Sequence, residues 1–426
     1  MGVVQREQGA KARFPWLQTP HLDRIAAEGV RFRNAFVVNS LCAPSRASFL
    51  TGCYGHVNGI VNNHTPFPES NVTYASVLRG AGYATGYVGK WHMGSQKERP
   101  GFDFAASFIS QGKYVDCPFV VNGTVTESKG WVDDVSTDYA VEFIRQNKGK
   151  PFLLAVGYKA VHGPFDPPER RKNTYEGEQA RPVPNLAVKP IYRAEAAPRK
   201  LRPGESGDVR TNLGYFRCVA AIDDNVGRLL KTLDDLGLAE DTLLVFAGDN
   251  GYYLGEHGLG DKRSAYDESL RIPLLVRYPR LGVKDKRVDE MVLNVDLAPT
   301  FIDYAGAEVK QATHGRSWRP LLEGKPAQWR HAYFYCYFYE RNFNTPTVTA
   351  VRTDTAKLIK YPGHDEWTEM FDLAADPYEL KNLYNDPAKA ALRRNLEAEY
   401  QRQAAAIAFR IPEFVDDPAK AASATR

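Results

Sequence analysis

The sequence has few cysteines, no long apolar run and almost no excess of charge. Five cysteines occur at irregular spacing: Cys42, Cys53, Cys117, Cys218 and Cys336. This odd number predicts neither a disulfide framework nor a cysteine metal site. No apolar run approaches the roughly 20 residues that a membrane-spanning helix needs, and residues 1–13 lack an apolar signal core. We expect no membrane span. The sequence as written indicates a cytoplasmic protein, and an exported protein is the open alternative.

The charge balance of the sequence does not indicate a large anionic partner. Lys and Arg number 55 against 51 Asp and Glu, a net charge of +4. No zinc-finger or phosphate-loop pattern is present, so nucleic acid is not an expected partner. A small anionic substrate needs only a local group of cations.

The 426 residues, 43% of them hydrophobic, are enough for a large core. Short apolar runs without alternation occupy residues 83–89, 151–157, 242–248 and 272–276. Such runs are typical of strands that are buried on both faces of a mostly parallel sheet. Helical spacing holds over residues 212–236. The sequence therefore predicts an α/β fold in which helices cover both faces of the sheet.

The character of the chain changes near residue 325. An aromatic-rich segment at residues 331–339 and a further segment at residues 348–360 indicate strands, and a helical pattern covers residues 387–409. These segments predict a small C-terminal α+β domain with an antiparallel sheet and a terminal helix. We expect a main domain over residues 1–325 and this second domain over residues 326–426.

One cysteine stands in a segment whose local chemistry suits an anion. Residues 41–52 read Leu-Cys-Ala-Pro-Ser-Arg-Ala-Ser-Phe-Leu-Thr-Gly. Pro44 fixes φ and Ser45 is a capping residue, so we expect a turn that leads into a short helix from Arg46 to Thr51. A helix N-terminus and Arg46 beside Cys42 favour a bound anion. The alternative is that Cys42 is a small buried hydrophobic residue.

The pattern Cys-x-Pro-Ser-Arg-x-x-x-Leu-Thr-Gly, complete at residues 42–52, resembles the signature of the type I sulfatases, members of the alkaline-phosphatase-like superfamily. The resemblance implies that Cys42 is converted to formylglycine, whose aldehyde hydrate is the nucleophile. The conversion implies a partner, either a formylglycine-generating enzyme or an anaerobic sulfatase-maturating enzyme. It also implies a mixed sheet between helices and a small C-terminal domain.

Polar residues follow three of the apolar runs directly. Lys90 and His92 come after the first run, His162 after the second, and Asp249 and Asn250 after the third. The carboxyl ends of strands meet at one edge of an α/β sheet, where ligands bind. Asp249 and Asn250 offer the oxygen ligands that Ca²⁺ and Mg²⁺ prefer. Taken alone, Asp-Asn-Gly is also a common turn, and Lys90 and His92 would be ordinary surface residues.

The resemblance assigns roles to these residues. Gly-Lys-Trp-His-x-Gly at residues 89–94 matches a second sulfatase signature, which implies that Lys90 and His92 lie beside the formylglycine. The pair Asp249 and Asn250 would bind Ca²⁺ or Mg²⁺ together with the residue derived from Cys42.

The resemblance also implies roles for residues in the segment at residues 255–273. A sulfate-contacting lysine is expected there, for which Lys262 is the choice and Arg263 the alternative, and His257 is expected to face the leaving group. Cations would neutralise the sulfate oxygens while a hydrate oxygen attacks sulfur. His92 is the expected base. His162 with Lys262 would protonate the departing alkoxide.

The beginning of the sequence departs from the sulfatase pattern. Residues 19–29 form a well-marked helix signal, with Thr19 as N-cap, Pro20 at the first position and a terminal Gly29. Sulfatases precede a similar helix with an apolar strand that ends in two adjacent aspartates, which bind the metal. Residues 1–18 contain no aspartate and no strand-like run. We therefore expect poor metal binding, slow turnover and unpaired backbone on the neighbouring strands. A misplaced start and a true loss of the strand are both open at this point.

The function that these patterns favour is hydrolysis of a sulfate ester, with a sulfated carbohydrate as substrate. Residues 248–279 and 339–343 are more similar to sulfatases of sulfated amino sugars, the N-acetylglucosamine-6-sulfatases among them, than to simple arylsulfatases. Two alternatives stay open. One is a phosphonate monoester or phosphodiester hydrolase of the same superfamily. The other is a non-catalytic protein that binds sulfated glycans and has lost the metal.

Overall fold

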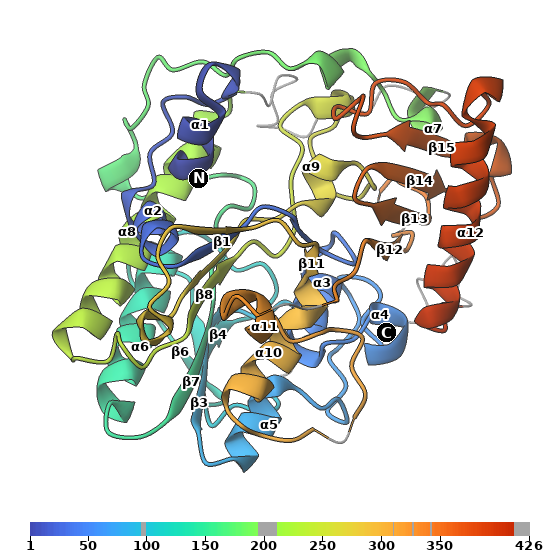
Figure 1. Ribbon diagram of the computed structural model, residues 1–426. Helices are drawn as coiled ribbons and strands as arrows, with labels where there is room; N and C mark the ends of the chain where they lie inside the picture. The colour runs from blue at the N-terminus through green and yellow to red at the C-terminus, as the bar shows by residue number, and fades with distance from the viewer. Residues whose placement is uncertain (95–98, 195–210, 310, 326–327, 341–342, 413–426) are drawn as a thin grey trace.

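The computed structural model of the chain describes residues 1–426 except 95–98, 195–210, 310, 326–327, 341–342 and 413–426 (Figure 1). Its described strands form two sheets in the main body, a small pair, and a separate C-terminal sheet. The five-stranded sheet has the order β6-β5-β4-β3-β7. Its strands are β3 (Ala84–Lys90), β4 (Phe104–Phe108), β5 (Phe119–Val121), β6 (Thr124–Thr126) and β7 (Phe152–Gly157). Strands β3, β4 and β7 run parallel.

The second sheet has the order β10-β1-β9-β8. Its strands are β1 (Val30–Phe32), β8 (Leu244–Ala247), β9 (Leu274–Arg277) and β10 (Lys286–Val288). Strand β9 is antiparallel to both β8 and β1, so the run predicted at residues 272–276 does not join a parallel array. Strand β2 (Ala35–Phe36) pairs with β11 (Val292–Leu293), and Phe36 also forms an isolated antiparallel bridge with Arg271.

Helices cover both faces of the body, as the apolar runs predicted. On one face α2 (Pro20–Ala27) and α6 (Val132–Asn147) pack against α8 (Leu213–Asp235). On the other face α3 (Cys42–Thr51) and α5 (Tyr74–Gly80) pack against α10 (Leu297–Tyr304). The short helices are α1 (Gly2–Gln8), α4 (Gly55–Asn58), α7 (Ile191–Ala194), α9 (Asp267–Leu270) and α11 (Arg319–Leu322).

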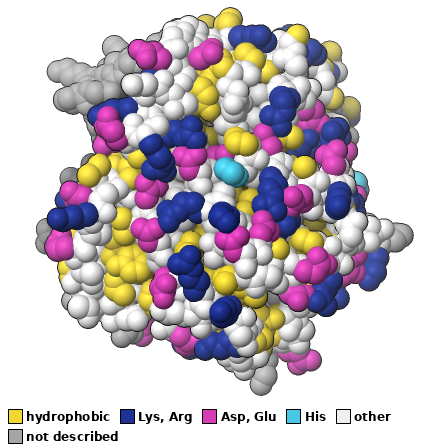
Figure 2. Space-filling model, turned by 90° about the vertical axis from the view of Figure 1, so that its left-hand side faces the viewer, with side chains coloured by type: hydrophobic (Ala, Val, Ile, Leu, Met, Phe, Trp, Pro, Cys, Tyr) yellow, Lys and Arg dark blue, Asp and Glu magenta, His cyan; other side chains and the backbone are white. Residues whose placement is uncertain are grey.

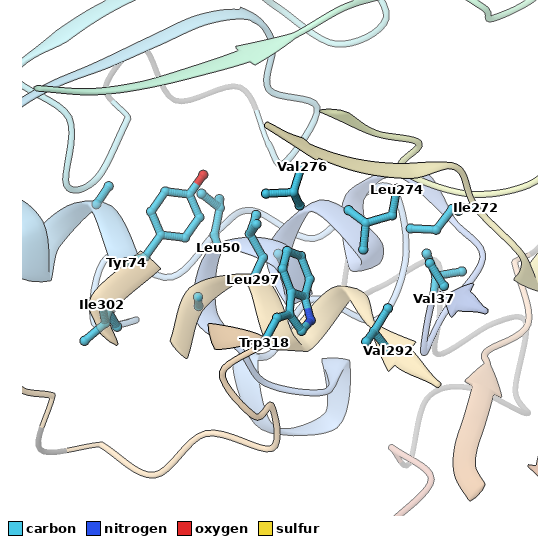
Figure 3. Packing of buried hydrophobic residues seen from close by; sticks show 14 of the residues in the cluster. Val37, Leu50, Tyr74, Ile272, Leu274, Val276, Val292, Leu297, Ile302 and Trp318 are labelled. Atoms are coloured by element: carbon cyan, nitrogen blue, oxygen red, sulfur yellow. The ribbon is translucent and has the colours of Figure 1, made fainter. Parts of the chain in front are cut away.

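A buried apolar cluster joins α3 and α10 to the second sheet. Trp318 is fully buried and lies among Leu297 of α10 and Val292 of β11, with Leu274 and Val276 of β9 nearby (Figure 3). This packing holds α3, the helix that begins with Cys42, against the body. No helix in the described part of the chain is long and apolar enough to cross a membrane.

The C-terminal sheet is antiparallel and has the order β12-β13-β14-β15. Its strands are β12 (Ala332–Tyr337), β13 (Val348–Thr353), β14 (Ala356–Lys360) and β15 (Glu369–Asp372), and α12 (Ala390–Ala406) packs on it. The segment predicted at residues 348–360 is thus a hairpin of two strands. The Tyr54 hydroxyl donates to the Phe334 carbonyl at 2.8 Å and ties this sheet to the body.

The segment before α2 contains α1 and a 3₁₀ turn, Gly9–Lys11, and no strand. Strands β7 and β8 are edge strands of the two body sheets, as β6 and β10 are at the opposite edges. Strand β7 pairs only with β3, and β8 only with β9, among the residues that the structure describes.

Candidate active site

Cys42 is the first residue of α3, four positions earlier than the helix predicted from Arg46. Leu41 is the extended residue before the helix, with φ −145° and ψ 141°, and Gly52 ends it in the left-handed region at φ 69°. Ser45 does not cap the helix, because its hydroxyl accepts a hydrogen bond from the Asn294 side chain at 3.0 Å. The Ala43 amide donates to the Asn63 side chain at 3.0 Å. The Cys42 side chain thus lies at a helix N-terminus, where an anion is favoured.

Three cations surround the Cys42 thiol. Lys262 Nζ lies 3.1 Å from Cys42 Sγ, and Lys90 and Arg46 interact electrostatically with the same thiol. Burial alone would raise the pKa of Cys42, but Lys262 and Lys90 lower it below its ordinary value. Burial lowers the pKa of Lys90 to about 8. The structure therefore places the predicted cations around one buried sulfur.

Arg46 is held by acceptors from three neighbouring segments. Its Nε lies 2.9 Å from Asp249 Oδ2, and one terminal nitrogen donates to the Lys90 carbonyl at 2.6 Å. The absence of a side chain at Gly157 makes room for it, because a Cβ there would lie 2.7 Å from an Arg46 terminal nitrogen. Arg46 lowers the pKa of Asp249 to about 2, despite burial that would raise it. Gly157 carried no motif, and sequence reasoning missed it.

The two predicted catalytic histidines, His92 and His162, are both neutral near pH 7. Burial, followed by Lys90, lowers the pKa of His92 to about 2, and burial with Lys262 does the same for His162. The sequence argument took the ordinary histidine pKa as the reason for a base at His92, and that reason does not hold here. A bound sulfate would act in the opposite direction, because negative charge favours the protonated imidazole.

Hydrogen bonds orient both rings. His92 Nε2 lies 2.9 Å from Gln111 Nε2, and the backbone of His92 has φ 62°, a left-handed conformation that non-glycine residues adopt at functional sites. His162 Nδ1 lies 2.8 Å from the Gly163 carbonyl, so Nδ1 carries the proton and Nε2 is free to accept. Lys159 donates to the Gln111 carbonyl at 2.9 Å. Gln111 and Lys159 come from segments without a motif and were not predicted.

Arg263 is buried away from direct contact with the thiol. It forms ion pairs with Glu340 at 2.6 Å and Asp261 at 2.8 Å, and its guanidinium lies 3.2 Å from the centre of the Phe343 ring. Both carboxylates hold Arg263 in place. Of the two candidate cations, Lys262 therefore contacts Cys42 and Arg263 does not. Glu340 also accepts from the Asn63 amide at 3.3 Å, which connects the C-terminal domain to the start of α3.

His257 lies in a different, buried cluster. Its ring stacks on Tyr266 with centroids 3.9 Å apart, and its Nε2 lies 3.1 Å from the Asn185 side chain and 3.8 Å from Glu268. Burial lowers its pKa to about 3. His257, Glu268 and Glu379 could hold a metal by distance, but Lys357 already forms an ion pair with Glu379 at 2.7 Å. The position of His257 fits a packing role better than contact with a leaving group.

A cavity of about 2880 Å³ collects the other predicted residues. Its lining includes all of them except His257: Cys42, Arg46, Lys90, His92, His162, Asp249, Asn250, Lys262 and Arg263. Ligand pockets in proteins are usually about 300–1,000 Å³. The cavity is therefore larger than a small substrate requires.

The residues expected to bind metal form an incomplete donor set. Asp249 already accepts from Arg46, and Asn250 Oδ1 is buried without a partner among the described residues. Ca²⁺ takes about 6–8 oxygens, and Mg²⁺ requires a near-octahedral shell. One carboxylate, one amide oxygen and an oxygen of the residue derived from Cys42 do not complete either site. The buried Asn250 oxygen is therefore an acceptor that no described donor reaches.

Comparison with known proteins agrees with this geometry. The sulfatase family profile matches residues 11–307, and the profile of the N-sulphoglucosamine sulphohydrolase C-terminal region matches residues 255–406. An N-acetylglucosamine-6-O-sulfatase of Bacteroides thetaiotaomicron is 33% identical over 89% of this chain and 80% of its own length. An ulvan-active sulfatase of Formosa agariphila is 30% identical over 92% of this chain and 77% of its own length.

A solved structure is also similar over nearly the whole chain. A protein in complex with its substrate D-glucosamine-2-N,6-O-disulfate superposes with a TM-score of 0.84 at 30% identity, covering 94% of this chain and 95% of that one. A phosphonate monoester hydrolase of Agrobacterium radiobacter shares the fold at a TM-score of 0.76 and 20% identity. The chain belongs to the sulfatase family, whose members are sulfuric ester hydrolases.

Proposed function

We propose that this chain hydrolyses a sulfate ester on a carbohydrate, with a 6-O-sulfated amino sugar as the preferred substrate. One observation carries the proposal: Lys262 lies 3.1 Å from Cys42 Sγ, in a cluster with Lys90 and Arg46. This arrangement suits a nucleophile that must approach an anionic centre. The amino sugar follows from the relatives, one an N-acetylglucosamine-6-O-sulfatase and one bound to a glucosamine disulfate.

The residues of the chain have distinct tasks in this proposal. Formylglycine made from Cys42 by a maturating enzyme supplies the oxygen nucleophile in sulfatases. Lys90 and Lys262 neutralise the sulfate oxygens, and Arg46 fixes Asp249 and the carbonyl of Lys90. His92 takes a proton once the sulfate charge has raised its pKa. Lys262, which Asp261 helps to hold charged, gives a proton to the departing alkoxide beside His162.

No step in this account passes through a metal ion, because the described donor set is incomplete. The sulfatase family implies Ca²⁺ or Mg²⁺ near Asp249 and Asn250. The metal-free chain would still bind and orient the sulfate through its cations. We expect turnover that is slow for the family and metal binding that is weak.

The test compares matched esters on one purified preparation. The chain is produced together with a formylglycine-generating enzyme and assayed on N-acetylglucosamine 6-sulfate, N-acetylglucosamine 6-phosphate and an aryl phosphonate monoester. The proposal predicts sulfate release from the first sugar, and none from a Cys42→Ala variant. Preference for the phosphonate would support the phosphorus hydrolase. Binding of the sulfated sugar without turnover in fully converted protein would support the non-catalytic alternative.

A further inference from the structure

One loop contacts both histidines of the active site. It covers residues 109–117, directly after β4. Gln111 Nε2 lies 2.9 Å from His92 Nε2, and the Tyr114 hydroxyl donates to the His162 carbonyl at 2.6 Å. The same hydroxyl accepts from the His162 amide at 3.1 Å. Because His92 follows β3 and His162 follows β7, this loop fixes the position of one histidine relative to the other.

Lys159 connects the two contact points of the loop. Its Nζ donates to the Gln111 carbonyl at 2.9 Å and lies 4.7 Å from the centre of the Tyr114 ring, a cation–π contact. Lys159 is only 4% exposed, and a lysine is almost never this buried without an ion pair. Its Nζ forms no ion pair within 4 Å in the part of the chain that the structure describes. Burial lowers the pKa of Lys159, and the charge of Asp133 opposes this shift. The loop therefore supplies the direct contacts of this ammonium group.

The backbone of Lys159 is fixed from the opposite side by α6. Asp133 Oδ1 accepts from the Lys159 amide at 2.7 Å, and Asp133 Oδ2 accepts from the Ala160 amide at 2.9 Å. Asp133 is fully buried, so these hydrogen bonds are shielded from water. The segment that leads to His162 is thus anchored on α6, and the Lys159 side chain sets its distance from the loop.

The loop itself is closely packed. Gly112 has φ 59°, in the left-handed region, and a Cβ there would lie 2.6 Å from the Phe108 ring. The Tyr114 ring stacks on Trp131 with centroids 5.9 Å apart, and Trp131 Nε1 donates to the Asp166 carbonyl at 2.9 Å. Packed interiors transmit strain, so a displacement at one contact of this loop will reach the other.

We propose that Lys159 is a positioning residue for sulfate ester hydrolysis, which holds the loop so that His92 and His162 keep the relative placement that the reaction needs. Lys159 and Gln111 line the same cavity as both histidines. The inference rests on the proposed function, in which His92 takes a proton and His162 lies beside the departing alkoxide. Such contacts act only within hydrogen-bond reach, and a displacement of about 1 Å can cost about 10²-fold in rate.

Two variants separate the two contacts of the loop. Tyr114→Phe removes the hydroxyl that holds His162 and leaves the ring beside Lys159 in place. Lys159→Met removes the ammonium group from both contacts, so it should displace both histidines. The matched control is Tyr139→Phe on α6, because the Tyr139 hydroxyl forms no hydrogen bond with any described residue.

Steady-state kinetics on two esters test the proposal. N-acetylglucosamine 6-sulfate has an alkoxide leaving group that needs a proton, whereas 4-nitrophenyl sulfate releases a phenolate that needs none. Tyr114→Phe should lower kcat for the sugar ester about tenfold or more with KM within about twofold, and should leave kcat for the aryl ester unchanged. Lys159→Met should lower kcat for both esters, because it displaces His92 as well. Tyr139→Phe should change neither.

Histidine NMR tests the placement without turnover. In protein labelled with ¹³C-histidine, His92→Gln and His162→Gln assign the two ring signals. Lys159→Met should shift both signals, Tyr114→Phe only that of His162, and the control neither, while the signal of His331, whose side chain is 85% exposed, should stay in place throughout. If Lys159→Met does not fold, Lys159→Gln takes its place with the same expectation.

Three outcomes would overturn the proposal: unshifted histidine signals in the Lys159 variant, an equal loss on both esters in Tyr114→Phe, or undiminished kcat in the Lys159 variant. Failure of the proposed function gives a different result, because the wild-type chain would then release no sulfate from the sugar ester. The histidine signals would still decide whether Lys159 positions the two rings.

Discussion

At the scale of single residues, the motif around Cys42 was the most informative part of the sequence. It predicted that Cys42, Arg46, Lys90 and Lys262 gather in one place, and the structure brings them together. Gly157, Gln111 and Lys159 were beyond prediction. They act through backbone space and hydrogen bonds from segments with no motif, and such contacts exist only once the chain has folded.

Lys262 provides the sharpest test among the cations. Lys262→Ala should lower kcat about 10²-fold or more while the protein stays folded, because the lysine acts on charge that develops in the transition state. The matched control is Lys231→Ala, since the Lys231 side chain is 74% exposed on α8. Steady-state kinetics on the sulfated sugar make the comparison, and equal kcat values for the two variants would remove Lys262 from catalysis.

Gly157 is predicted to be as important as the charged residues that it adjoins. A Cβ at this position would lie 2.6 Å from the Lys90 carbonyl and 2.8 Å from the Tyr87 hydroxyl. Gly157→Ala should therefore displace Arg46 and reduce stability by about 1–3 kcal/mol, as overpacking does. Gly149→Ala is the control, because nothing lies within 4 Å of its added Cβ. Chemical denaturation measures both, and equal stabilities would contradict the crowding argument.

At the scale of elements, prediction succeeded where a long periodic or apolar run settles the structure. Helix α8 and strands β3, β7 and β8 occupy the predicted segments. Helical spacing of apolar residues marks the helix in the sequence, and continuous apolar runs mark the three strands. The start of α3 was wrong by four residues, since Ser45 bonds to Asn294 and leaves the helix to begin at Cys42. The hairpin of β13 and β14 was merged into one segment, because only two residues separate the strands.

A buried ion pair connects β14 to α9, the short helix after the active-site loop. Lys357 is fully buried, with its Nζ 2.8 Å from Asp267 and 2.7 Å from Glu379. Lys357→Met should destabilise the protein by about 3–5 kcal/mol, because the buried Glu379 loses its lysine partner and Asp267 keeps only its ion pairs with Arg271 and Arg352. An exposed control, Lys231→Met, should change stability by less than about 0.5 kcal/mol. Urea unfolding of both variants tests this, and a small effect at Lys357 would show that Arg352 compensates.

Glu369 at the start of β15 gives the C-terminal sheet a pH dependence. Burial raises its pKa from 4.5 to about 7, although Tyr266 and Tyr361 donate to it. The folded pKa lies above the unfolded one, so its contribution to stability is complete below pH 4.5 and is lost as the pH rises through about 7.

Glu369→Gln should remove this dependence. Between pH 5 and 7 the wild-type chain should lose about 2–3 kcal/mol of stability more than the variant does, since one pKa unit corresponds to about 1.4 kcal/mol. Denaturation midpoints at the two pH values measure the difference. Parallel pH profiles for the two proteins would mean that Glu369 is ionised throughout.

At the scale of the whole molecule, the body is two sheets that share a helical cover and meet at the active site. The sequence indicated an α/β body with a C-terminal antiparallel sheet, and residue 325 stays our proposed boundary between the two. It did not show that the body sheet is split, because register and pairing depend on which strands are present together.

The face in Figure 2 shows Lys and Arg interspersed with Asp and Glu, as the net charge of +4 suggested. On this face the cations are mixed with carboxylates, so we expect the buried cluster to recognise the anion.

The most direct test of the account is the chemical state of Cys42 measured together with turnover. Mass spectrometry of the tryptic peptide that contains Cys42 gives the converted fraction in preparations made with and without a formylglycine-generating enzyme. Sulfate release from N-acetylglucosamine 6-sulfate is followed on the same samples. The account predicts that the rate rises in proportion to the formylglycine fraction and is zero for Cys42→Ala. Sulfate release from unconverted protein, or undiminished release from Cys42→Ala, would contradict it.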